Sequence, residues 1–133
     1  MRVAGWEQAL VEAIERHVAL PFSWGVSDCA VLTTDCIAAV TGERPFGGPF
    51  RYRSEIGAAK WLRRKGLDDL AALGASRFEE CPPSLARRGD IGMIERDGKI
   101  CAGVFTSQGF VSKAERGIIA EPVTAVARAF RID

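Results

Sequence analysis

The chain has 133 residues, 47% of them hydrophobic and 26% charged, and its 18 basic and 17 acidic residues leave a formal charge of +1. This length favours a single domain, which we place at residues 1–133, and it suffices for one hydrophobic core. Domains that bind nucleic acids usually carry a strong excess of basic residues. The balanced charge therefore argues against nucleic acid as a partner.

The sequence also argues against a membrane span and a resident cofactor. Its first twenty residues are charged and periodic, unlike a signal peptide, and no window approaches the roughly 18 apolar residues of a membrane-spanning helix. We therefore expect a soluble protein made in a cytoplasm, where cysteines stay reduced. The four cysteines are Cys29, Cys36, Cys81 and Cys101. They lack C-x-x-C spacing, so we predict no metal site and no cofactor, although folding could still gather several thiols.

The first half of the chain is expected to be helical. Apolar residues recur at helical spacing over residues 6–18, and Pro21 ends that helix. After a short turn, a second helix begins at Ser27 or Asp28, either of which can cap free backbone N–H groups. It is apolar on most of its surface and ends at Gly42. We expect this second helix to be central.

Residues 42–53, GERPFGGPFRYR, contain two prolines and three glycines and are predicted to form a loop. Loops of this length often bind ligands or partners. Ser54 can then cap a third helix over residues 55–65. A fourth, short helix over residues 67–73 is expected to stop at Gly74.

The second half of the chain is expected to form strands. Residues 91–95 and 100–105 flank Asp97-Gly98, a strong signal for a two-residue hairpin turn. Further short strands are expected at residues 110–111, 118–120 and 129–132, with a helical turn after Pro122. Helices followed by an antiparallel sheet predict an α+β fold.

Cys29 stands at the predicted start of the central helix, where the free backbone N–H groups can activate a nucleophile. The unpaired N–H groups of a helix N-terminus favour thiolate over thiol and lower the cysteine pKa. The same groups can stabilise an oxyanion. The alternative is a buried cysteine that only packs.

The run PFSWGVSDC over residues 21–29 resembles the NlpC-type cell-wall peptidases, which share a papain-like fold. In that family an aromatic-Gly turn, here Trp24-Gly25, precedes Asp-Cys, here Asp28-Cys29, and the Cys is the nucleophile. A later Gly-Asp before a strand is matched by Gly89-Asp90. The chain is most similar to a phage-borne relative encoded among tail-tip genes, which also has a Gly-Phe-Val stretch, as at residues 109–111. The resemblance covers most of the chain. It implies a papain-like domain with N-terminal helices packed on a C-terminal antiparallel sheet.

The chain departs from this family at the general base. The peptidases carry a His at the start of the strand after Gly-Asp, and it pairs with the Cys. Here Cys101 stands nearest that position, and no His follows His17. His17 is either a base supplied from the preceding helix or a packed, hydrogen-bonded structural residue. Asp28 is interpreted as a helix cap, and Asp35 as a surface or partner-facing carboxylate.

A thiol cannot replace imidazole as base, and loss of one member of a nucleophile–base pair costs several orders of magnitude in rate. We therefore expect a degenerate peptidase site in a structural or assembly protein of a phage tail tip or baseplate. Such a protein is made in the bacterial cytoplasm, contacts a hub or distal tail protein, and resides in the virion. The alternative is an active cysteine peptidase or amidase that cuts peptidoglycan during phage entry. The catalytic candidates are Cys29 and His17, and the candidates for a cleft or interface are Trp24, Asp28, Phe46, Phe50, Tyr52 and Cys101.

Overall fold

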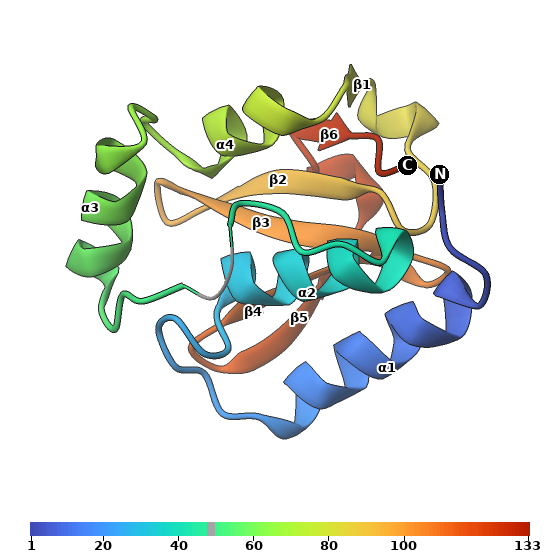
Figure 1. The fold of residues 1–133 in the computed structure, drawn as a ribbon, viewed down its shortest axis with the longest axis horizontal. Helices are drawn as coiled ribbons and strands as arrows, with labels where there is room; N and C mark the ends of the chain where they lie inside the picture. The colour runs from blue at the N-terminus through green and yellow to red at the C-terminus, as the bar shows by residue number, and fades with distance from the viewer. Residues whose placement is uncertain (48–49) are drawn as a thin grey trace.

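The computed structural model describes residues 1–47 and 50–133, and these residues form an α+β fold, as predicted (Figure 1). The helices are α1 (Trp6–Ala19), α2 (Cys29–Thr41), α3 (Glu55–Arg64) and α4 (Leu70–Arg77). The strands are β1 (Glu80–Cys81), β2 (Ile91–Arg96), β3 (Lys99–Thr106), β4 (Gly109–Ala114), β5 (Gly117–Glu121) and β6 (Arg128–Phe130). They form one antiparallel sheet in the order β1-β6-β2-β3-β4-β5. Short 3-10 turns at Pro83–Leu85 and Val123–Ala125 complete the described chain.

Helix α2 is the central helix, as its apolar sequence predicted. The Asp28 carboxylate caps it by accepting from the backbone N–H of Val31 at 2.8 Å, and Gly42 ends it in the left-handed conformation (φ 82°). Its buried Thr33 and Thr34 hydroxyls donate to carbonyls one turn earlier, so no polar group is left unpaired there. The helix packs on α1 and on β3 and β4, within the largest hydrophobic cluster.

The β2–β3 hairpin confirms the turn signal in the sequence. Asp97 (φ 53°) and Gly98 (φ 75°) are both left-handed, as the two central residues of a type I′ turn require. The paired strands are each slightly longer than predicted, with Arg96 opposite Lys99 at the turn. The helical turn after Pro122 and short strands β4, β5 and β6 also lie where the sequence placed them.

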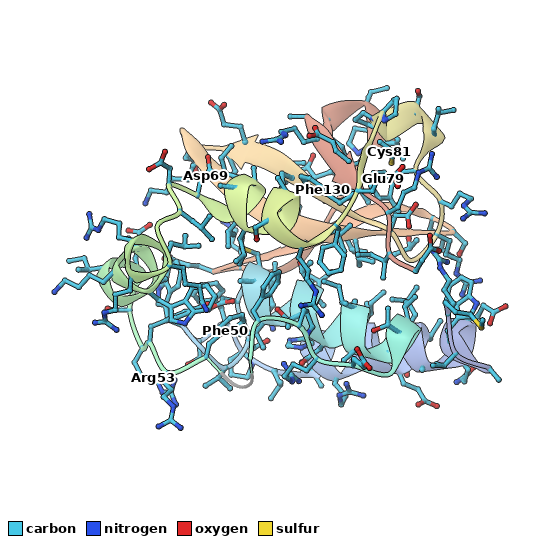
Figure 2. All side chains as sticks on the ribbon, turned by 45° about the horizontal axis from the view of Figure 1, so that its top comes forward. Phe50, Arg53, Asp69, Glu79, Cys81 and Phe130 are labelled. Atoms are coloured by element: carbon cyan, nitrogen blue, oxygen red, sulfur yellow. The ribbon has the colours of Figure 1, made fainter. Side chains whose placement is uncertain are left out.

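A fourth helix is present, as predicted, but its predicted bounds of residues 67–73 were wrong. Helix α4 begins after Asp69, whose carboxylate accepts from the N–H of Ala72 at 2.8 Å, and it runs through Gly74 to Arg77. Gly74 is buried against the Phe130 ring, which lies beneath α4 in Figure 2, and a Cβ at this glycine would come 3.1 Å from that ring. The glycine allows close packing of α4 on β6 instead of ending the helix. The two-residue strand β1 was not predicted.

Strands β3 and β4 separate at one end, and this separation creates the site. They pair only from Gly103↔Ser112 to Thr106↔Gly109, after which β4 continues with β5 alone. Within the described residues, no strand pairs with residues 99–102 on that edge. The first turn of α2 occupies this gap. On one side, Lys113 of β4 donates to the Ser27 hydroxyl at 2.5 Å. On the other side, the N–H of Ala102 on β3 is directed at the Cys29 sulfur.

The two chain ends lie side by side and are bound to each other (Figure 1). Arg2 donates from Nε to the Ile132 carbonyl at 3.0 Å and from Nη2 to the Asp90 carboxylate at 2.9 Å. Asp90, only 1% exposed, also accepts from the N–H groups of Ile132 (2.9 Å) and Arg87 (2.8 Å). The Gly89-Asp90 motif thus serves here to join the termini to the start of β2.

Candidate functional site

Cys29 is the first residue of α2 and lies in a groove, which we call the Cys29 groove. The groove consists of two adjoining hollows of about 510 and 540 Å³. They share six lining residues: Trp24, Asp28, Cys29, Glu55, Lys99 and Cys101. Two aromatic rings form part of its rim, where Trp24 packs edge-on against Phe22 with ring centroids 5.1 Å apart. Glu55 of α3 forms an ion pair with Lys99 of β3 across the groove wall.

The groove floor holds two free thiols, Cys29 from α2 and Cys101 from β3, and both line the two hollows. Hydrogen bonding with the Cys29 thiol is the main reason why the pKa of Cys101 falls to about 7, and the charges of Arg96 and Lys99 lower it further. The pKa of Cys29 is raised well above its usual value, first by the hydrogen bond to Cys101 and then by burial. The pair therefore loses its first proton easily and its second with difficulty.

This result reverses the expectation that the helix N-terminus lowers the pKa of Cys29. The N-terminal N–H of Val31 is already taken by the Asp28 carboxylate, which places a negative charge beside Cys29 and raises its pKa. The thiolate of the pair forms instead on Cys101, where cationic side chains lie.

Arg96, at the end of β2, supplies the nearest such charge. Its Nη1 and Nη2 atoms are buried and make no hydrogen bond to any of the described residues, and the Glu121 carboxylate is 3.8 Å from Nη2. A buried guanidinium that makes no hydrogen bond is costly unless an anion lies nearby. Besides the Glu121 carboxylate, the thiolate of Cys101 is such an anion, and the Arg96 charge is among the causes that lower the pKa of Cys101.

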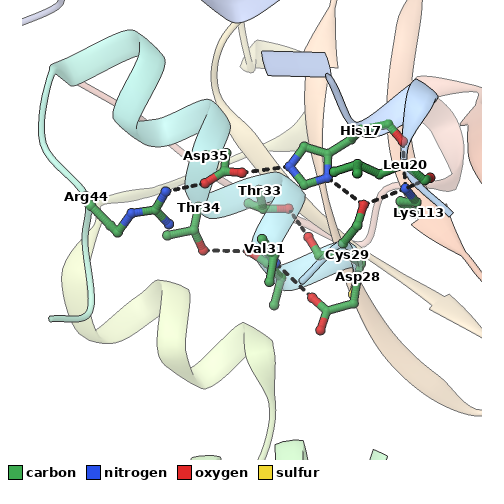
Figure 3. A network of polar contacts seen from close by, with 12 residues as sticks. His17, Leu20, Asp28, Cys29, Val31, Thr33, Thr34, Asp35, Arg44 and Lys113 are labelled. Atoms are coloured by element: carbon green, nitrogen blue, oxygen red, sulfur yellow. Dashed lines mark hydrogen bonds and ion pairs between the residues drawn. The ribbon is translucent and has the colours of Figure 1, made fainter. Parts of the chain in front are cut away.

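His17 lies in a polar network that joins the end of α1 to the first turns of α2 (Figure 3). Its Nδ1 is 2.7 Å from the Ser27 hydroxyl and its Nε2 is 2.7 Å from the Asp35 carboxylate. Because Lys113 donates to Ser27 Oγ, the hydroxyl hydrogen of Ser27 can be donated to Nδ1 while Nε2 donates to Asp35. Both ring nitrogens are thus engaged, and the imidazole is 2% exposed.

Two further residues complete this network. Lys113 also donates to the carbonyls of His17 (2.6 Å) and Leu20 (2.7 Å), and its burial lowers its pKa. Asp35, expected at the surface, is 14% exposed. Burial by itself would raise the pKa of Asp35, but the hydrogen bonds from His17 and Arg44 outweigh it and hold that pKa below its usual value. The network fixes the end of α1 against the start of α2.

Asp28 is confirmed as a helix cap. Besides the N–H of Val31, its carboxylate accepts from the Gly25 N–H and from the Tyr52 hydroxyl, both at 2.9 Å. Burial is the main reason why the pKa of Tyr52 is raised. Asp28 therefore holds the Trp24-Gly25 turn, the helix and the loop before α3 in one place.

The two phenylalanines predicted as site candidates lie outside the Cys29 groove. Phe50 is buried and packs edge-on against Trp61, with ring centroids 4.8 Å apart. Phe46 packs against Phe78, at 6.2 Å between centroids. Both line a separate cavity of about 20 Å³ beside α2. The other candidates, Trp24, Asp28, Tyr52 and Cys101, all line the groove with Cys29.

Sequence reasoning did not find Arg96, Lys99 or Lys113. Arg96 and Lys99 flank the hairpin turn, where charged residues are ordinary. Lys99 lies two residues before Cys101 on β3, and the register of β2 with β3 brings Arg96 near them. The one available signal for Lys113 was its place inside the strand pattern of β4. A lysine at such a place indicates a buried amine that must find hydrogen-bond partners.

The four cysteines are free and differ in their surroundings. Cys36 and Cys81 are buried in separate hydrophobic clusters, as expected for packing residues. Across residues 1–47 and 50–133, no three side chains of His, Cys, Asp or Glu converge in a way that could hold a metal ion. In the same residues, no helix is both long enough and apolar enough to cross a membrane.

Comparison with known proteins gives a single family. No curated protein and no solved structure is significantly similar to the chain. The model of a domain of unknown function, DUF6950, matches residues 1–132. Because this match covers nearly the whole chain and includes both thiols of the groove, the protein belongs to the DUF6950 family.

Proposed function

We propose that the protein is a papain-like domain that has lost hydrolytic activity and serves as a structural or assembly component of a phage tail tip or baseplate. The observation that carries the proposal is Cys101, which lines the same groove as Cys29 and, by order along the chain, stands nearest the position expected for the base of the resembling peptidases. The proposal implies a hub or distal tail protein as the partner and the virion as the location.

The surroundings of Cys29 support the absence of hydrolysis. A general base must lie within one hydrogen bond, or one bridging water, of the proton that it removes. The imidazole of His17 is bound by Ser27 on one side and Asp35 on the other. The group that does contact the Cys29 thiol is another thiol, and it raises the pKa of Cys29. A nucleophile in that state is protonated at neutral pH.

The phage-tail part of the proposal rests on the resemblance of residues 21–29 and on the arrangement around them. A buried helix begins at Cys29 against an antiparallel sheet, and Trp24 and Asp28 of the same run form the rim and the cap. These residues maintain a groove in a domain that has lost hydrolysis. That groove is the place where a segment of the partner protein binds. The presence of the chain in tails purified from its host tests this part directly. Its absence from those tails would contradict it.

Substitution of Cys101 by His tests the catalytic part. The change places an imidazole where the base would stand, while Cys29 remains the nucleophile. We expect muropeptide turnover at background level for the wild type and for Cys29→Ala alike. Cys101→His should make Cys29 more reactive toward iodoacetamide at pH 6, since a thiolate–imidazolium pair lowers the cysteine pKa. The double variant Cys101→His, Cys29→Ala is the control.

The alternative, an active peptidase, predicts a different pattern. Turnover of muropeptides by the wild type that Cys29→Ala abolishes would refute the loss of activity. A similar loss with His17→Gln, in a variant that keeps its thermal unfolding temperature, would identify His17 as the base.

A further inference from the structure

Two thiols from different parts of the chain meet on the floor of the Cys29 groove. Cys29 comes from the first turn of α2 and Cys101 from β3, 72 positions later, and both free thiols line the two hollows of the groove. They meet there because β3 and β4 separate beyond Gly103 and leave room for the helix end. Two free thiols that share one groove floor can bond to each other once their side chains reach disulfide geometry.

The charges around the pair are unequal. Arg96 and Lys99 lie on the Cys101 side, and the Arg96 guanidinium has two buried nitrogens without a hydrogen-bond partner among the described residues. On the Cys29 side lies the Asp28 carboxylate. A negative sulfur is therefore favoured at Cys101 and disfavoured at Cys29. Attack on an oxidant starts from a thiolate, so the two cysteines are suited to different steps.

We propose that Cys101 and Cys29 form a redox-active dithiol site, in which Cys101 attacks a low-molecular-weight disulfide and Cys29 resolves the product into an internal Cys29–Cys101 disulfide. In the first step the Cys101 thiolate forms a mixed disulfide and releases one thiolate. In the second step the Cys29 sulfur attacks the Cys101 sulfur and releases the second thiolate, which takes the Cys29 proton. The two protein thiols lose two electrons in total, and the small disulfide is reduced to two thiols.

The internal disulfide links the first turn of α2 to β3 across the groove floor. It is reversed by excess small thiol, so the site is reduced in a cytoplasm and oxidised in a disulfide-forming environment. The other two cysteines serve as internal controls. Cys36 and Cys81 are buried in hydrophobic clusters, and burial raises the pKa of both thiols.

Titration of the folded protein with glutathione disulfide tests the proposal. We expect the wild type to lose two thiols and to give a Cys29–Cys101 disulfide in peptide mapping, while Cys36 and Cys81 stay reduced. Cys29→Ser should stop at a stable mixed disulfide of Cys101 with glutathione. Cys101→Ser should react at least tenfold more slowly, because its remaining thiol lacks the cationic surroundings.

Arg96 gives a second, independent measurement. Arg96→Gln should slow alkylation of Cys101 by iodoacetamide at pH 7 several-fold and shift its rate profile to higher pH. Arg116→Gln is the matched control, because Arg116 lines the same groove but is not among the groups that act on Cys101. Three results would each overturn the proposal: no Cys29–Cys101 disulfide under glutathione disulfide, faster reaction of Cys29 than of Cys101, or equal effects of the two arginine substitutions.

Discussion

Replacement of Asp28 by Ala measures how firmly the Cys29 turn is held. The Asp28 carboxylate is 1% exposed and accepts three hydrogen bonds, one from the N–H of Val31 as helix cap and two from Gly25 and Tyr52. Loss of a helix cap costs about 1 kcal/mol. The Gly25 and Tyr52 donors are part-buried, so each costs about 1–2 kcal/mol more when it is left without its acceptor. We therefore expect Asp28→Ala to lower the free energy of unfolding by about 3–5 kcal/mol.

The same chain offers a matched control in Asp69. That residue caps α4 through one hydrogen bond, to the N–H of Ala72, and it is partly exposed. Asp69→Ala should cost only the cap, about 1 kcal/mol. Urea unfolding of both variants at pH 7, with equal m values, gives the difference directly. A difference below about 0.5 kcal/mol would refute the view that Asp28 is the central hydrogen-bond acceptor of the turn.

Three further predictions concern other parts of the fold. Asp90→Ala should lower the free energy of unfolding by about 3 kcal/mol in urea titrations, because it leaves a part-buried guanidinium, the buried N–H of Ile132 and the part-buried N–H of Arg87 without their acceptor; a cost under about 1 kcal/mol would contradict this. Gly103→Ala should cost about 3 kcal/mol or more, since its Cβ would come 2.3 Å from the backbone oxygen of Val111, and an unchanged thermal midpoint would contradict that clash. Asp35 has a lowered pKa in the folded state, so the stability it provides is present above the pKa of the unfolded chain, about 3.9, and is lost as the pH falls through the folded pKa. Asp35→Asn should therefore show a smaller fall in the thermal midpoint between pH 5 and pH 3 than the wild type, and an equal fall would contradict the assignment.

Local signals predicted most of the secondary structure because a few neighbouring residues decide it. Asp28 caps α2 through a residue three positions away, and Asp97-Gly98 closes its hairpin with its own backbone angles. Gly74 led to a wrong helix end, since the residue that explains it, Phe130, follows 56 positions later. A short-range pattern cannot distinguish a glycine that ends a helix from one that admits a neighbouring ring.

The site could be predicted only in part for the same reason. Cys29 was found from its place at a helix start, and Cys101 from the order of strands along the chain. The charge that acts on Cys101 was not found, because Arg96 approaches it through the pairing of β2 with β3. The partners of His17 were also missed. Asp35 reaches the imidazole only after α1 and α2 have packed side by side.

The hydrogen bond from the Arg2 side chain to the Ile132 carbonyl holds the two ends of the chain together. It joins positions 130 apart in the sequence, at the end of the molecule away from the first turn of α2 (Figure 1). Terminal residues usually fray unless something ties them down, and here each end restrains the other. Any polypeptide attached before Met1 or after Asp133 therefore leaves the domain from one shared exit, and the mouth of the Cys29 groove stays open whichever end carries the fusion.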